Sequence, residues 1–147
     1  MLISQRCRYA IKAVLELAIR PLNEPVKVQQ IADAQEMPER FLEVILNELR
    51  HGGFVASRRG SDGGYYLVKR PAELTLGELI EHIQGPVEDL IVEEKIEASD
   101  NSFGTGALRK LRQQITGRIN DLYYGTTIAD LVEWESTAKL QATNYMI

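Results

Sequence analysis

Apolar residues recur at three- and four-residue steps through the first fifty positions, which is the spacing of one helix face, and prolines interrupt the pattern. The pattern predicts three helices: one from a Ser4 cap to about Arg20, one over residues 28–34, and one from Pro38 to about Arg50. The buried stripe of the third helix is predicted to consist of Phe41, Leu42, Ile45, Leu46 and Leu49.

Two short stretches rich in aromatic and β-branched residues follow, at 54–58 and 65–69, and they are typical of strands. The glycine-rich segment 60–64 between them tolerates positive φ angles, so it predicts a tight turn. A further helix is predicted from a Thr75 cap to about Gln84, where a Gly-Pro pair ends it. The front of the chain therefore predicts a three-helix unit followed by a β-hairpin.

The second half of the chain has a different pattern. Residues 86–105 are acidic and show little periodicity, so a loop is predicted there. A long helix over 106–124 carries a narrow apolar seam, and a short helix over 127–136 is predicted to precede an apolar tail. The seam consists of Leu108, Leu111, Ile115, Ile119 and Leu122. The predicted fold is mainly α with a small β-hairpin, divided into a domain over 1–85, the acidic loop, and a helical unit over 106–147.

The amino-acid composition limits the classes to which the protein can belong. Of the 147 residues, 44% are hydrophobic and 26% are charged, which suits one folded domain with an extension. No apolar run approaches the roughly 18–20 residues that span a bilayer, and the basic N-terminus lacks a signal-peptide cleavage pattern. A single cysteine excludes an internal disulfide, so a cytoplasmic protein without a membrane segment is expected.

The net charge of −4 conceals an uneven distribution. Residues 1–72 carry 11 basic and 8 acidic side chains, whereas residues 73–147 carry 6 and 13. A mildly basic front half is compatible with nucleic-acid binding, and an acidic back half with a separate assembly or sensing element. A chance asymmetry is the alternative.

Arg58 and Arg59 precede the glycine-rich turn, so the hairpin would present two guanidinium groups near its tip. Such groups can pair with phosphates or enter a narrow minor groove, while a neighbouring short helix lies in the major groove. A plain hairpin with solvated arginines is the alternative, and the residues alone favour neither. An enzyme is not predicted, because no phosphate-binding loop opens a helix and no nucleophile–base set is apparent.

A family resemblance rests on four motifs: Arg8-Tyr9-Ala10, Phe41-Leu42-Glu43, LRxxG over 49–53 and RGxxGGYxL over 59–67. In this order and on these predicted elements, they resemble the Rrf2 family of bacterial transcription regulators. The resemblance covers about the first 85 residues and continues more loosely through Gly85-Pro86 and the segment 126–131. It implies a winged helix-turn-helix domain, with the hairpin as the wing, in a homodimeric DNA-binding regulator that is expected to be a repressor.

The resemblance also implies roles for individual residues. Residues 38–49 would be the recognition helix, in which Glu43 accepts a hydrogen bond from a cytosine amino group. A solvated surface glutamate is the alternative for Glu43. Arg59 would enter the minor groove, and Arg8 with Tyr9 would contact phosphates, although Tyr9 can equally belong to the core. The implied DNA-binding set is Arg8, Tyr9, Glu39, Arg40, Glu43, Arg50, Arg58, Arg59, Gly60, Gly63, Gly64 and Tyr65.

Arg40 replaces a small hydroxyl residue that is common in relatives, which predicts a different base preference.

The apolar seam of the long helix needs a partner, because so narrow a stripe does not bury itself. It can pack on the winged domain of the same chain or on a second subunit, and the resemblance favours the second subunit. A two-fold dimer would present two recognition helices to a near-palindromic operator, with half-sites about one helical turn or a multiple apart.

Many relatives hold an iron–sulfur cluster with three closely spaced cysteines and one further ligand. Residues 88–106, the matching stretch, contain no cysteine and no histidine, so no cysteine-ligated cluster, metal site or other cofactor is expected.

Cys7 lies between Arg6 and Arg8, which could lower the pKa of its thiol and make it redox-reactive. An ordinary helix-start residue is the alternative for Cys7.

The cluster-free branch of the family resembles the back half of this chain best. One member of that branch represses cysteine metabolism and uses a partner enzyme, cysteine synthase, as its sensor, so the same partner is a hypothesis here. A winged-helix adaptor that binds proteins and never touches DNA is the competing function. The wing arginines and the basic front half favour DNA over the adaptor.

Overall fold

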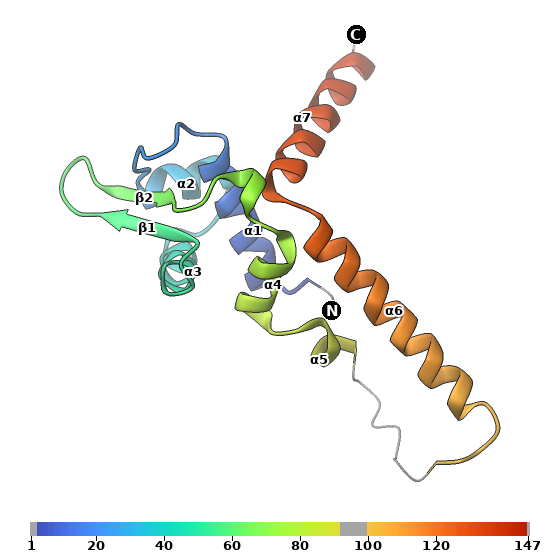
Figure 1. Cartoon of the computed structure of the whole chain (residues 1–147). Coiled ribbons are helices and arrows are strands. Elements are labelled where there is room, and N and C mark those ends of the chain that lie inside the picture. The colour runs from blue at the N-terminus through green and yellow to red at the C-terminus, as the bar shows by residue number, and fades with distance from the viewer. Residues whose placement is uncertain (1–2, 92–99, 147) are drawn as a thin grey trace.

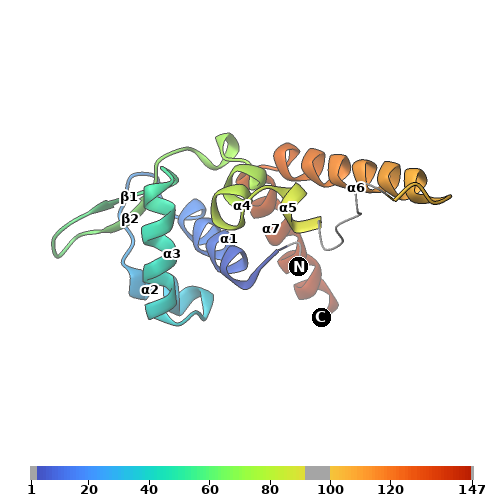
Figure 2. The ribbon, with the colours of Figure 1, turned by 90° about the horizontal axis from the view of Figure 1, so that it is seen from below.

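The computed structural model describes residues 3–91 and 100–146, which form a helical domain with a protruding hairpin and two projecting helices (Figure 1). The hairpin and the long helix α6 extend in opposite directions from this domain (Figures 1 and 2). The elements are α1 Gln5–Ala18, α2 Val28–Gln35, α3 Glu39–His51, β1 Val55–Arg58, β2 Gly64–Leu67, η1 Pro71–Glu73, α4 Leu76–Gln84, α5 Val87–Ile91, α6 Thr105–Gly125 and α7 Ile128–Tyr145. The predicted fold class, mainly helical with a β-hairpin wing, is confirmed.

The helix starts follow the predicted capping residues. The Ser4 side chain accepts a hydrogen bond from the backbone nitrogen of Cys7, 3.1 Å away, at the start of α1. Thr75 caps α4 in a capping box with Glu78, in which each side chain bonds the backbone nitrogen of the other residue. Pro38 immediately precedes the first turn of α3, where its missing N–H costs no helix hydrogen bond.

Helix α1 lies at the centre of the domain and contacts α2, α3, α4, α7 and β2. Its buried face carries small residues, Ala10 and Ala13, which let the neighbouring helices approach closely. Large apolar side chains from these neighbours fill the remaining space, and the fully buried ones include Ile31, Leu42, Leu46, Leu49, Leu79 and Ile80. The first helix therefore organises the core, and these five neighbours are placed by packing on it.

The hairpin is a two-stranded antiparallel sheet in which Val55 pairs with Leu67 and Arg58 pairs with Gly64. The segment before α2 adds a bridge on the free edge of β2. There Val26 and Tyr65 exchange two backbone hydrogen bonds, each of 2.8 Å. The wing is thus anchored to the helical unit by backbone pairing as well as by side-chain packing.

The helices α4 and α7 begin side by side. The backbone nitrogen of Leu76 donates to the Thr126 carbonyl at 2.8 Å, and that of Ile128 donates to the Leu74 carbonyl at 2.9 Å. Thr127 caps α7 with a capping box of its own. This junction ties the end of α6 and the start of α7 to the winged domain.

Three predictions about local structure are wrong. Phe41 is 61% exposed, because Leu42, Ile45, Leu46 and Leu49 already fill the buried arc of α3 and Phe41 lies about 100° from Leu42. Residues 87–91 of the predicted acidic loop form α5, and residues 92–99 lie outside the described part. The last helix continues to Tyr145 rather than ending near residue 136, since no glycine or proline interrupts that stretch.

Candidate DNA-binding surface

The outer face of α3 is polar and open to solvent. Glu39, Arg40, Glu43, Asn47 and Arg50 are all exposed there. Arg50 donates to the Asn47 side-chain oxygen at 2.7 Å, so its guanidinium lies along the helix surface. The predicted polar residues of α3 therefore share one accessible surface, on the opposite side of the helix from its buried leucines.

The position of α3 is set at both ends. The backbone of Glu36 is in the left-handed conformation, with a φ of 52°. This residue ends α2 and turns the chain toward α3. Near the other end, Arg6 of α1 forms an ion pair with Glu48. The ring of His82 donates from Nε2 to the Glu48 carbonyl at 2.9 Å and lies against Phe54, so α4 also fixes the end of α3. His82 and Glu48 are 34 positions apart in the sequence, so only the fold shows this contact.

The wing carries its two arginines in different settings. The guanidinium of Arg58 lies 5.8 Å from the centre of the Tyr66 ring, which is a cation–π distance. Arg59 follows the end of β1 and is exposed at the start of the turn. The stacked Arg58 is held against the strand, while Arg59 extends into solvent where a ligand can reach it.

The three predicted glycines shape the backbone of the wing. Gly60 has a φ of +108°, and its backbone carbonyl accepts from the Gly63 nitrogen at 3.0 Å. Gly63 is buried, and a Cβ there would collide with the Arg58 carbonyl oxygen. Gly64 has a φ of +152°, and a Cβ there would run into the backbone of Val26. These positions need glycine for backbone geometry, whatever the wing contacts.

The two predicted aromatic residues are half-buried. Tyr9 on α1 packs against the core, while its hydroxyl accepts from Gln5 Nε2 at 2.9 Å. Tyr65 on β2 also packs against the core. The neighbouring Arg8 is exposed at the start of α1. The structure thus places the Tyr9 ring against the core, and the contact of its hydroxyl with a phosphate stays a prediction.

Cys7 is fully buried, and the prediction of a lowered thiol pKa is wrong. Burial instead raises the pKa of the Cys7 thiol to about 11. The flanking arginines do not compensate for this, since Arg6 pairs with Glu48 and Arg8 faces solvent. The side chain is a small apolar filler of the core near the start of α1.

The native protein is therefore expected to resist thiol alkylation. With a pKa of about 11 in place of the ordinary 9.0, the thiolate fraction at pH 8 is lower by about a hundredfold. Iodoacetamide labelling followed by mass spectrometry should accordingly be at least about a hundredfold slower in the native state than in denaturant. Cys7→Ser is the unlabelled control. Equal labelling rates in the two states would show that the thiol is accessible.

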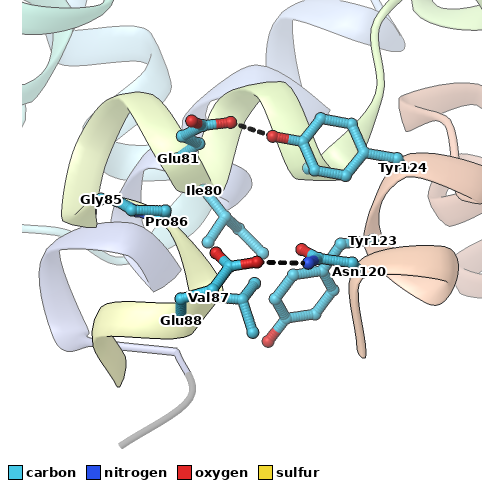
Figure 3. A pocket seen from close by; sticks show the side chains of 10 residues that line it. Ile80, Glu81, Gly85, Pro86, Val87, Glu88, Asn120, Tyr123 and Tyr124 are labelled. Atoms are coloured by element: carbon cyan, nitrogen blue, oxygen red, sulfur yellow. Dashed lines mark hydrogen bonds between the residues drawn. The ribbon is translucent and has the colours of Figure 1, made fainter. Parts of the chain in front are cut away.

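The long helix α6 is attached to α4 and α5 through one face (Figure 3). Tyr123 is buried there, and the ring of Tyr124 covers Gly77. The Tyr124 hydroxyl donates to the Glu81 carboxylate, a bond that raises the pKa of Tyr124 to about 12. Asn120 Nδ2 donates to Glu88 at 2.9 Å across a hollow of about 220 Å³. This contact orients α6 relative to the winged domain.

The apolar seam of α6 is left mostly uncovered by its own chain. Ile119 alone of the five packs against the core. The exposed fractions of the others are 62% for Leu108, 53% for Leu111, 43% for Ile115 and 60% for Leu122. Packing of the whole seam on the winged domain of the same chain is therefore ruled out for the described structure.

The residues of this chain do not fit a thiolate-ligated iron–sulfur cluster. The sequence has one cysteine, Cys7, and its thiol is buried in the core with a raised pKa. Among residues 3–91 and 100–146, no three His, Cys, Asp or Glu side chains are grouped so that they could hold a metal ion. No helix in those ranges is long and apolar enough to cross a membrane.

A three-helix unit with an exposed polar third helix, followed by an arginine-bearing hairpin, defines a winged helix-turn-helix DNA-binding protein. The profile of the Rrf2 family, described as an iron-dependent transcriptional regulator, matches residues 3–134. The chain belongs to the Rrf2 family of transcription regulators. The resemblance drawn from the sequence motifs is thereby confirmed.

Several relatives are similar over most of the chain. The regulator CymR of Bacillus subtilis is 31% identical over 134 residues, covering 91% of each protein. An IscR regulator from Serratia proteamaculans is 31% identical over 134 residues, covering 90% of this chain and 79% of IscR. An Rrf2-like regulator of Rhodobacter capsulatus is 44% identical over 92 residues, and the match spans 60% of this chain and 61% of that protein.

Solved structures agree with this assignment. The structure of B. subtilis CymR, described as the global cysteine regulator, has a TM-score of 0.79 at 30% identity and covers 91% of this chain and 98% of its own. The T. potens IscR structure has a TM-score of 0.72 at 25% identity, with 94% and 90% covered. The relatives are transcription regulators rather than enzymes.

Proposed function

We propose that this chain acts as a homodimeric repressor that binds a near-palindromic operator, with α3 in the major groove and the wing in the minor groove. One observation carries the proposal: the wing extends from the domain in one direction and α6, with its uncovered apolar seam, extends in the other (Figure 2). Two copies joined along α6 would leave both sets of DNA-contacting residues free. That arrangement suits two half-sites related by two-fold symmetry.

The DNA contacts follow from the chemistry of the exposed side chains. On α3, the Glu43 carboxylate can accept from a cytosine amino group and Arg40 can donate to guanine or to phosphate. On the wing, Arg59 can enter a narrow minor groove, where the potential is most negative. Arg8 at the start of α1 can bind a phosphate. Glu39 and Arg50 lie on α3 before and after Arg40 and Glu43, and both are exposed on the same helix.

The dimer contact follows from the energetics of the α6 seam. Four large apolar side chains on one helix face are unusual on a monomer surface and are typical of an interface. Covering each of these side chains would stabilise the dimer by about 1–2 kcal/mol, at the usual free energy of transfer per unit of apolar surface removed from water. A second α6 presents a matching stripe, so pairing of two copies buries both stripes at once.

Replacing Arg59 by alanine tests the proposed DNA contact. Loss of a charged contact is expected to weaken operator binding by about 1.5–3 kcal/mol and to reduce the salt-dependence slope by about 1. Fluorescence anisotropy over a range of salt concentrations measures both quantities. The matched control is Lys139→Ala, which removes one exposed charge from α7 and should leave affinity unchanged. Identical affinities for the two variants would contradict the proposed role of the wing.

The competing adaptor function makes a different prediction for the same assay. A winged-helix adaptor would bind no duplex at any salt concentration, whereas the proposed regulator binds DNA most tightly at low salt. Control by cysteine synthase stays a prediction from the resemblance. Adding that enzyme to the binding assay tests it directly.

A further inference from the structure

Two large apolar side chains stand out on the otherwise polar outer face of α3. Val44 is 63% exposed and Phe41 is 61% exposed. Val44 lies one helical turn after Arg40 and directly follows Glu43, so it borders the surface proposed to face DNA. Neither side chain is part of the core, and the seam on α6 is on a different element.

Phe41 and Val44 also form one side of a hollow between α1 and α3. The hollow has a volume of about 530 Å³ and is lined by Gln5, Arg6, Tyr9, Phe41, Val44 and Ile45. Its surface is mainly apolar, Arg6 is among its lining residues, and Val44 lies one helical turn after the exposed Arg40. An apolar patch among basic residues favours a nucleic acid over an apolar protein surface as its occupant.

The major groove offers one apolar group on its base edges, the C5-methyl group of thymine. We propose that Val44, with Phe41 beside it, contacts the methyl group of a thymine in each half-site. This inference rests on the proposed function, in which α3 occupies the major groove. It adds a specificity-determining residue that the sequence motifs did not indicate.

The helix geometry places the expected thymine near the base read by Glu43. Consecutive residues are about 100° apart and rise by about 1.5 Å along the helix, so the two side chains reach neighbouring positions. Base pairs are stacked at about 3.4 Å, and the thymine should therefore lie within about two base pairs of the cytosine contacted by Glu43.

The test removes the methyl group from the DNA and the valine from the protein. A duplex is first selected from a random library with the wild-type protein. Each thymine of that duplex is then replaced by deoxyuridine, which lacks only the C5-methyl group, and the dissociation constants are measured. Wild type should lose about fourfold in affinity at one thymine position per half-site, the value of one buried methyl group. Val44→Ala should bind the thymine and deoxyuridine duplexes equally at that position.

Val68→Ala is the matched control, because Val68 is also an exposed valine but follows β2 rather than lying on α3. It should retain the wild-type loss on deoxyuridine substitution. If the library yields no enriched duplex, the proposed function fails and this inference fails with it. If a duplex is enriched but no deoxyuridine position distinguishes wild type from Val44→Ala, the thymine contact alone is wrong.

Discussion

An Ile115→Glu variant is expected to be monomeric and to lose at least about a hundredfold in affinity for a two-half-site operator. Ile115 lies in the middle of the α6 seam and is 43% exposed in the single chain. In the proposed dimer, each copy would bury one unpaired carboxylate in an apolar contact, at a cost of about 3 kcal/mol or more. Sedimentation velocity measures the oligomeric state, and a mobility shift with one or two half-sites measures binding.

A matched control separates charge from position on α6. Gln113 is exposed two residues earlier and lies about 200° around the helix from Ile115, so Gln113→Glu adds the same charge away from the seam. This control should remain dimeric and bind the operator as tightly as wild type. The variant Ile115→Glu should still fold, because the side chain contributes little to the core of its own chain. A dimeric Ile115→Glu protein with full operator affinity would refute the proposed interface.

The Gly64→Ala substitution is expected to destabilise the protein by about 3–4 kcal/mol and to abolish the contribution of the wing to DNA binding. Gly64 has a φ of +152°, and an added Cβ would press against the Val26 carbonyl group and lie 2.9 Å from the Lys27 nitrogen. That backbone belongs to the bridge between Val26 and Tyr65, so relief of the clash would break two hydrogen bonds. Urea unfolding measures the change in the free energy of unfolding.

Gly60→Ala is the control for this substitution. Gly60 also has a positive φ, of +108°, but a Cβ there would meet no atom within 4 Å. It should therefore cost only the conformational strain, about 1–2 kcal/mol. The difference between the two variants measures the close approach of the wing to the segment before α2. Equal destabilisation would mean that this contact does not hold the wing.

Much of the local structure could be predicted from short-range patterns. The caps at Ser4 and Thr75 and the turn at Gly60 depend on residues within a few positions of one another, and each has a clear sequence signature. The buried leucines of α3 likewise follow from helical periodicity. These features are local, so the sequence is sufficient to predict them.

Two of the wrong predictions, those for Phe41 and Cys7, depended on what lies next to the residue in space. Phe41 has the spacing of a core residue, yet it is 61% exposed, because Leu42, Ile45, Leu46 and Leu49 fill the buried arc of α3. Cys7 was judged by its neighbours in the chain, whereas its pKa is set by burial in the core. The contact of His82 with the Glu48 carbonyl spans 34 positions and has no local signal.

The sequence by itself determined most of the elements, the wing with its arginines and the family, because periodicity, capping and motif spacing are properties of the chain. It also showed that α6 carries an apolar seam and that a cluster of thiolates is absent. Only the tertiary structure decided that this seam is uncovered, that Cys7 is buried and that Val44 is exposed beside Glu43. Burial depends on which surfaces pack together, and that depends on the whole fold rather than on any one segment.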